Sequence, residues 1–274
     1  RGEHLIAIKN NGLKIISELG DMIIHPAKAS DNPADFEIAD IVLFCVKSYD
    51  TESSSNLIKP IVGQNTAVIP FLNGIGHIEI MQKILGKNSV IGGVAAISAL
   101  ISEPGVIQHN SAMQMLKFGE FNNIISPRIK AFQEACEKSG INNNIPENIE
   151  CDIWQKIIMI CTLAGANCIT RLPLGVCRTN PATRNFMKNL AEEAVEIAKA
   201  ENIILPDNQV EITMKQLDSL PEAMKASTLP ALEKGEKLEA SALNGAISIL
   251  GNKHKINTPA HKAVYAALSP HENG

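Results

Sequence analysis

Residues 154–170, WQKIIMICTLAGANCIT, are the stretch that decides the fold. They predict a helix that is apolar almost all the way round, which is typical of a helix in a protein core. The stretch is shorter than the roughly 20 apolar residues that cross a bilayer, so we do not expect it to span a membrane. Lys156 shares a face with Ile160, Leu163 and Asn167 at about 100° per residue. Its ammonium either extends into water past a buried stem or faces a partner or a ligand.

The composition is that of an ordinary globular protein. The chain has 274 residues, 45% of them hydrophobic and 20% charged, which is long enough for two domains. A net charge of −4 without a basic block does not indicate nucleic-acid binding. The six cysteines show no CxxC or Cys/His metal spacing, so we expect no metal site and a reduced, cytoplasmic location. No secretory signal is recognisable.

Alternating strand and helix patterns predict an α/β fold for the first half of the chain. Strands are expected at 13–17, 22–25, 38–47, 67–72 and 89–99, and helices at 4–10, 51–61 and 79–85. The continuous apolar run at 38–47 predicts a strand buried on both faces. Lys47 and Asn73 end two consecutive strands, where open α/β sheets bind ligands. The alternative is that they are an ordinary strand end and an ordinary turn.

The second half of the chain predicts an all-helical domain. The first domain is expected to close with a hairpin at 106–109 and 113–119, followed by a helix at 126–140. The polar stretch at 142–148 then predicts a linker. Helices are expected at 151–170, 181–201, 207–219, 230–251 and 259–268. Glu239 would lie inside an apolar helix, where a carboxylate needs a partner or a cleft. Ser227 precedes that helix, and serine there is more often a cap than a ligand contact.

The chain resembles the ketopantoate reductase (2-dehydropantoate 2-reductase) family over its whole length. The matching segments are RGEHLIAI at 1–8, ADIVLFCVK at 39–47, LNGIG at 72–76, PGVIQH at 104–109, WQK at 154–156, LE at 238–239 with NG at 244–245, and TP at 258–259. The resemblance implies a Rossmann-type N-terminal domain at 1–146 and an all-α C-terminal domain at 147–274. The family's glycine-rich pyrophosphate loop is missing from this chain. The first βα unit, about 30 residues, is therefore expected upstream of Arg1.

The resemblance also implies the reaction and the residues that carry it. The family uses NADPH to reduce the ketone of a 2-oxo acid. The implied activity here is reduction of 2-dehydropantoate to pantoate, in pantothenate biosynthesis and the coenzyme A pathway. Lys156 would be the general acid that protonates the carbonyl oxygen. Asn73 would contact both substrate and cofactor, and Ser227 would contact the substrate carboxylate.

The resemblance assigns the remaining cofactor contacts to Arg1, Lys47, Ala99 and Glu239. Arg1 would bind the 2′-phosphate of NADPH, and Lys47 would lie toward the adenosine end. Ala99 would make a backbone contact. Glu239 would lie near the nicotinamide ribose and Lys156, where its carboxylate would favour the charged ammonium. The expected partner is a small 2-oxo acid, with no nucleic acid and no membrane. The oligomeric state is open, with a homodimer as one option.

Two departures from the family pattern bear on the substrate. Family asparagines that line the pocket correspond to Ile160, Ala164 and Leu174 in this chain. The family's Ser-Met-x-x-Asp pattern reads STLPA at 227–231. A different, more apolar 2-oxo acid is therefore an alternative substrate.

Two further alternatives stay open. Asn167 or Asn244 could supply the missing amide from a neighbouring turn. A non-catalytic, truncated family member is the alternative if the native chain begins near Arg1.

Overall fold

The computed structural model describes residues 1–274 and divides them into two compact units. The first unit comprises Arg1–Cys45, Glu52–Phe71 and Met81–Ile149, and the second comprises Val46–Thr51, Leu72–Ile80 and Glu150–Gly274. Two short segments that follow strands of the first unit therefore belong to the helical unit. This division assigns Lys47 and Asn73 to the same unit as Lys156.

The first unit is built on two sheets. The strands are β1 (Leu13–Ser17), β2 (Met22–Ile24), β3 (Ala39–Phe44), β4 (Val62–Pro70), β5 (Gly92–Glu103), β6 (Val106–Gly119) and β7 (Asn143–Asn144). One sheet has the order β2-β1-β6-β5 with β7 on β6, and the other pairs β3 with β4 in parallel. A parallel bridge between Val68 and Val90 joins β4 to the segment before β5. The alternation of strands and helices confirms the predicted α/β class for this half.

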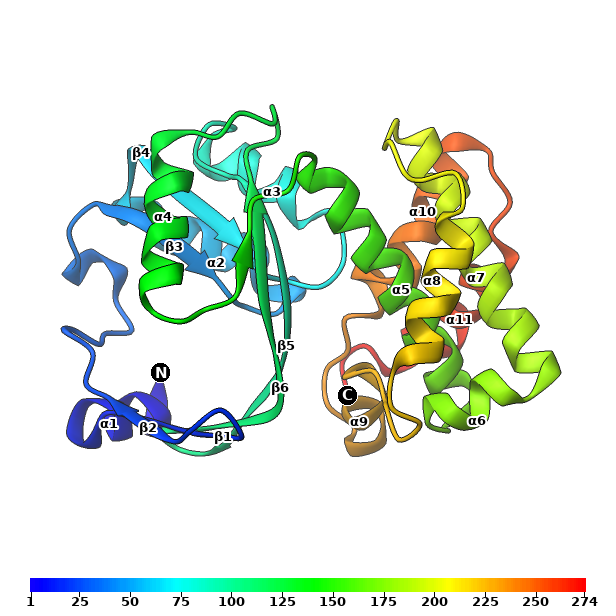
Figure 1. Ribbon diagram of the computed structural model, residues 1–274, viewed down its shortest axis with the longest axis horizontal. Coiled ribbons are helices and arrows are strands. Elements are labelled where there is room, and N and C mark those ends of the chain that lie inside the picture. The colour runs from blue at the N-terminus through cyan, green and yellow to red at the C-terminus, as the bar shows by residue number, and fades with distance from the viewer. The chain divides into compact units, whose positions relative to one another are not determined.

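Helices flank the strands in this half of the chain (Figure 1). They are α1 (Gly2–Asn11), α2 (Thr51–Ile58), α3 (His77–Leu85) and α4 (Pro127–Lys138). Helix α4 begins as the sequence predicts, because the Ser126 hydroxyl accepts from the Ile129 amide and Pro127 takes the first position. Its buried side of Ile129 and Cys136 packs on β4 and on Phe118 in one hydrophobic cluster.

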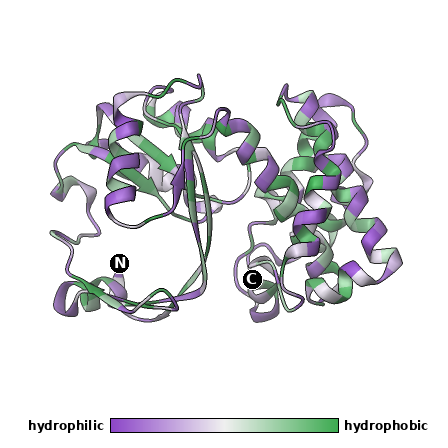
Figure 2. Ribbon diagram, viewed as in Figure 1, coloured by the Kyte–Doolittle hydropathy of each residue, from purple (hydrophilic) through white to green (hydrophobic).

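Two strand predictions are wrong in detail. Strand β3 was expected to be buried on both faces, yet only Phe44 in it is buried, and Leu43 is 49% exposed. The reason is that β3 is an edge strand, which pairs with β4 alone and leaves its other side uncovered. Both strands are nevertheless hydrophobic along much of their length (Figure 2). The hairpin expected within 106–119 is instead the single strand β6, which pairs with β5 along almost its whole length (Figure 1).

The second unit is all-helical, as predicted. Its helices are α5 (Ile149–Thr170), α6 (Leu174–Thr179), α7 (Pro181–Ala200), α8 (Gln209–Ser219), α9 (Thr228–Lys234), α10 (Asn244–His254) and α11 (Pro259–Leu268). Helix α6 was not predicted. The helix expected at 230–251 is also wrong, because α9 ends at Gly235 with φ of 66° and α10 begins only at Asn244. A left-handed glycine ends a helix at little cost.

Helix α5 forms the centre of the second unit. Its side chains enter two hydrophobic clusters, one through Cys168 and the other through Leu163, Ala164 and Ala166. At 22 residues it is longer than predicted, and by length and composition alone it could cross a membrane. In this structure 67% of its most apolar window is buried by the rest of the protein, as expected for a core helix.

A largely buried ion pair connects α4 to the sheet. The Arg128 guanidinium donates to both carboxylate oxygens of Glu120, at 2.8 Å each, and to the carbonyl oxygens of Thr66 and Asn88. The two side chains are 20% and 13% exposed. The pair between Arg184 and Asp218 has similar geometry but is 43% and 41% exposed.

We therefore expect Arg128→Ala to lower the free energy of unfolding by about 3–5 kcal/mol, because the largely buried Glu120 carboxylate loses its cation and keeps the Ser126 hydroxyl as a donor. Arg184→Ala is the matched control and should cost less than about 1 kcal/mol. Urea unfolding followed by far-UV circular dichroism measures both. Equal losses for the two variants would contradict this assignment.

Candidate active site

Lys156 lies in the first turns of α5, on a helix that the core surrounds. Its neighbours Trp154, Ile157 and Ile158 are buried. Loss of hydration at this position lowers the pKa of Lys156 from 10.5 to about 8. The shift argues against an ammonium fully extended into water, because a solvated lysine would keep its ordinary pKa.

The loop that carries Asn73 connects β4 to α3 and is pressed against the segment after Glu239. Gly74 has φ of 95°, and a Cβ there would lie 2.4 Å from the carbonyl oxygen of Ala242. The next residue, Ile75, donates its amide to that same oxygen at 3.2 Å. Only glycine fits such a close approach with a positive φ. The loop therefore has a fixed position on the short 3₁₀ helix at Ala240–Ala242.

His77, the first residue of α3, is a site residue that the sequence analysis missed. It is 5% exposed, and its Nδ1 has no hydrogen-bond partner. Burial, and then the charge of Lys156, lower its pKa to about 4. The imidazole is therefore neutral at neutral pH, and the Lys156 ammonium meets no second cation there. Its place four residues after Asn73, at the start of a helix, was the available signal in the sequence.

Glu239 binds the other strand-end segment. Its Oε1 accepts from the Ser48 amide at 2.8 Å and its Oε2 lies 3.4 Å from the Lys47 ammonium. Glu239 is 12% exposed in its side chain and Lys47 is 58% exposed. The carboxylate thus pairs with Lys47, and the pKa of Lys156 is lowered by burial.

The other residues singled out in the sequence fall into two places. Arg1 is exposed ahead of α1, and Ala99 pairs with His109 in the β5–β6 ladder, both in the first unit. Ser227 is exposed in the second unit, directly before α9, and its hydroxyl makes no capping hydrogen bond. The second unit thus contains Lys47, Asn73, Lys156, Ser227 and Glu239. Hydrogen bonds or electrostatic contacts connect their segments, and the segment of Ser227 is joined to α5 through the Ala226 amide, which donates to Asn167.

Two of the three positions where the family has pocket asparagines are fully buried. Ala164 and Leu174 lie in one apolar cluster with Met187, Leu217 and Ala226.

Asn167 and Asn244, which could replace the missing pocket amides, form hydrogen bonds within the protein. Asn244 Nδ2 donates to the carbonyl of Cys161 at 3.1 Å and contacts His261 Nδ1 at the same distance. Asn167 bonds the main chain at both ends of its amide. Both side chains are buried, and the Nδ2 of each already donates within the protein.

Comparisons with known proteins agree with this architecture. Residues 1–123 match the family described as ketopantoate reductase PanE/ApbA, and residues 148–272 match ketopantoate reductase PanE/ApbA C terminal. An uncharacterized oxidoreductase, YkpB, from Bacillus subtilis is 29% identical over 97% of this chain and 87% of its own. A 2-dehydropantoate 2-reductase from Mesorhizobium japonicum is 26% identical over 98% and 87%.

A solved structure gives the same picture. The PanE/ApbA family ketopantoate reductase from Ralstonia eutropha superposes with a TM-score of 0.89 at 26% identity, covering 99% of this chain and 88% of that one. The matched family is one of NAD(P)-dependent oxidoreductases. The chain belongs to the ketopantoate reductase family.

The lowered pKa of Lys156 has a consequence for stability. Between pH 8 and 10.5 the unfolded chain holds a proton on Lys156 that the folded chain has released. Stability should therefore rise with pH in this window, by about 3 kcal/mol at most at about 1.36 kcal/mol per pKa unit. The difference in unfolding free energy between wild type and Lys156→Met isolates this contribution. A difference that stays flat from pH 8 to 10.5 would refute the shift.

Proposed function

We propose that this protein reduces the ketone of a 2-oxo acid with NADPH, with 2-dehydropantoate as substrate, pantoate as product and Lys156 as the general acid. One observation carries the proposal. A lysine with a pKa of about 8 lies on a core helix, and its charge lowers the pKa of His77, the residue that begins α3 directly after the loop of Asn73. A general acid works best when its pKa lies near the operating pH. At pH 7 this ammonium is mostly protonated, yet it gives up its proton more easily than a solvated lysine.

The chemistry follows from charge. A reduced nicotinamide supplies the hydride, and hydride addition to a ketone leaves negative charge on the oxygen. The Lys156 ammonium stabilises that oxygen and then donates its proton to it. In this proposal Asn73 orients the ketone and Ser227 binds the carboxylate. Holding both ends fixes the orientation of the substrate, so that the ketone and not the carboxylate lies at Lys156.

The proposed cofactor contacts are consistent with the chemistry of the side chains. Lys47 is an exposed cation beyond the carboxyl end of β3, and Asn73 follows β4, which is where open α/β sheets bind nucleotides. Arg1 is exposed and would bind the 2′-phosphate through its planar guanidinium. Ala99 would contribute a backbone contact, and Glu239 would lie near the nicotinamide ribose. A preference for NADPH over NADH rests on Arg1.

Two features of the chain bear on where the protein works and whether it is active. A cytoplasmic location is proposed because all six cysteines are free thiols. The alternative of a non-catalytic family member predicts no turnover with any 2-oxo acid.

A more apolar 2-oxo acid is the second candidate substrate, and a specific observation favours it. Ala164 and Leu174 offer no hydrogen bond, and the amides of Asn167 and Asn244 are used by the protein itself. A pocket that hydrogen-bonds a hydroxyl can discriminate by about 10⁴-fold, whereas an apolar wall discriminates far less. The substrate hydroxyl would then contribute little to binding.

Lys156→Ala tests the catalytic assignment. Its kcat on the best 2-oxo acid should fall by about 10²–10⁴ while NADPH affinity stays close to wild type, because removal of a general acid acts on the chemical step. Wild-type kcat should itself fall as pH rises through about 8, the pKa of Lys156. Lys188→Ala, on an exposed face of α7, is the control. The same assay with NADH tests the cofactor, and equal use of both would remove the role given to Arg1.

The substrate is tested by comparing kcat/KM for ketopantoate with that for 2-oxo-3,3-dimethylbutanoate, which lacks the hydroxyl. An apolar pocket should give a ratio below about 100. A larger preference for ketopantoate would show that hydroxyl recognition survives and that 2-dehydropantoate is the better assignment.

A further inference from the structure

The side chain of Asn167 joins two segments that are far apart in the sequence. It is fully buried; its Oδ1 accepts from the Ala226 amide at 2.9 Å, and its Nδ2 donates to the Leu172 carbonyl at 2.8 Å. Loss of such an amide leaves a buried donor and a buried acceptor unsatisfied, so the geometry that satisfies both is strongly preferred. Ala226 is the residue directly before Ser227.

The segment that leads to Ser227 is a strap, which we define as Glu222–Ala226. Leu174 donates its amide to the Met224 carbonyl and Gly175 donates to the Glu222 carbonyl, each at 2.9 Å. A Cβ on Gly175 would lie 2.8 Å from the Cβ of Glu222, so the strap runs in close contact with the start of α6. The bond to Asn167 is the last of these attachments before Ser227.

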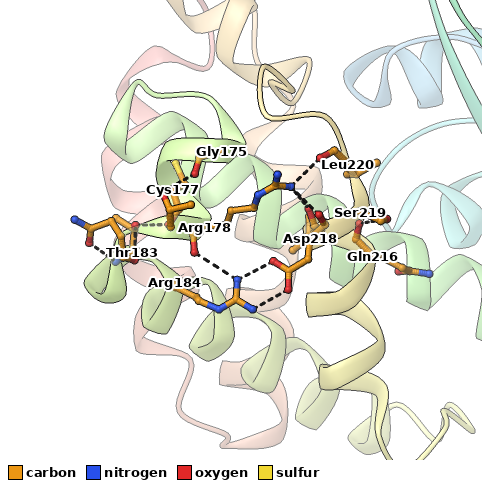
Figure 3. A network of polar contacts seen from close by, with 12 residues as sticks. Gly175, Cys177, Arg178, Thr183, Arg184, Gln216, Asp218, Ser219 and Leu220 are labelled. Atoms are coloured by element: carbon orange, nitrogen blue, oxygen red, sulfur yellow. Dashed lines mark hydrogen bonds and ion pairs between the residues drawn. The ribbon is translucent and has the colours of Figure 1, made fainter.

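The start of the strap is anchored as well. The Arg178 guanidinium on α6 donates to the carbonyl oxygens of Leu217, Asp218 and Leu220 at the end of α8, at 3.1, 2.9 and 2.7 Å (Figure 3). Helix ends leave carbonyl groups unsatisfied, and a cation there both bonds them and favours the helix dipole. With α8 held at one end and Asn167 at the other, the strap has little freedom.

Helix α5 carries both the proposed general acid and this attachment. Lys156 and Asn167 are separated by about three turns and lie on the same face at about 100° per residue. A buried helix is a rigid spacer, so the position of the strap relative to Lys156 is set by α5. A substrate held by its carboxylate at one residue and protonated by another needs such a fixed spacing.

We propose that Asn167 is a positioning residue for the substrate. It holds the strap so that Ser227 presents its hydroxyl to the carboxylate of a 2-oxo acid. The inference rests on the proposed function, and it assigns Asn167 no contact with the substrate itself.

The first test is kinetic, on the full-length protein. Asn167→Ala should raise KM for the 2-oxo acid about tenfold or more with kcat within about threefold of wild type, because it removes binding that the ground state and the transition state share. Asn180→Ala is the matched control. Asn180 also accepts backbone amides through its Oδ1, at the start of α7, but has no link to the strap. Its KM should stay within about twofold of wild type.

A double-mutant cycle with Ser227→Ala separates positioning from general damage. If Asn167 acts through Ser227, adding Asn167→Ala to Ser227→Ala should raise KM no further. Equal increases in both backgrounds, or no increase in either, overturn the proposal.

Asn167→Asp is the conservative variant. A buried Asp keeps the shape of Asn and, when protonated, both hydrogen bonds. Its KM should approach the wild-type value at about pH 5.5 and rise with pH as the carboxyl ionises. If the ratio of the KM of Asn167→Asp to the KM of wild type does not change with pH, the proposal is wrong.

Hydrogen exchange gives a reading that needs no turnover. Backbone amides of residues 222–229 should exchange faster in Asn167→Ala than in Asn180→Ala. If wild-type protein reduces no 2-oxo acid, the proposed function fails, and this exchange measurement alone decides whether Asn167 holds the strap. Unchanged exchange in the strap overturns the inference even if the enzyme is active.

Discussion

The structure depends on placing one lysine on a helix that the rest of the second unit buries. Hydration favours a charged ammonium, and its loss is what lowers the pKa of Lys156 to about 8. The cost is limited because burial also keeps His77 neutral, so that no second cation there opposes the ammonium. The ammonium is therefore left with a proton that it can donate near neutral pH.

Much of this arrangement could be predicted from sequence, because it rests on local patterns. The apolar run around Lys156 predicts a core helix, and Ser126 with Pro127 predicts the start of α4. The division into an α/β half and a helical half follows from the change in hydrophobic period after residue 148. The positions of Lys47 and Asn73 follow from the rule that open sheets bind ligands at strand ends.

The predictions that were wrong or missing concern contacts between segments that are distant in the sequence. Glu239 lies in a run of good helix formers, but the loop of Gly74 packs against Ala242 and the helix is interrupted there. No local pattern shows that Val46–Thr51 and Leu72–Ile80 belong with the helical unit. His77 was missed for the same reason. A histidine at a helix start is unremarkable until its buried Nδ1 and the charge of Lys156 are known.

The polar groups of α5 and its neighbours differ in what burial does to them. The amides of Asn167 and Asn244 are buried; both ends of the Asn167 amide and the Nδ2 of Asn244 have partners in the protein, so they hold segments in place. Lys156 and His77 are buried at a cost in pKa, and His77 Nδ1 lacks a partner. Proteins seldom keep such costs in a core without a functional reason. On this helix Asn167 fixes geometry, and the lysine whose pKa is lowered marks where the chemistry is proposed. Burial alone does not separate the two kinds of residue.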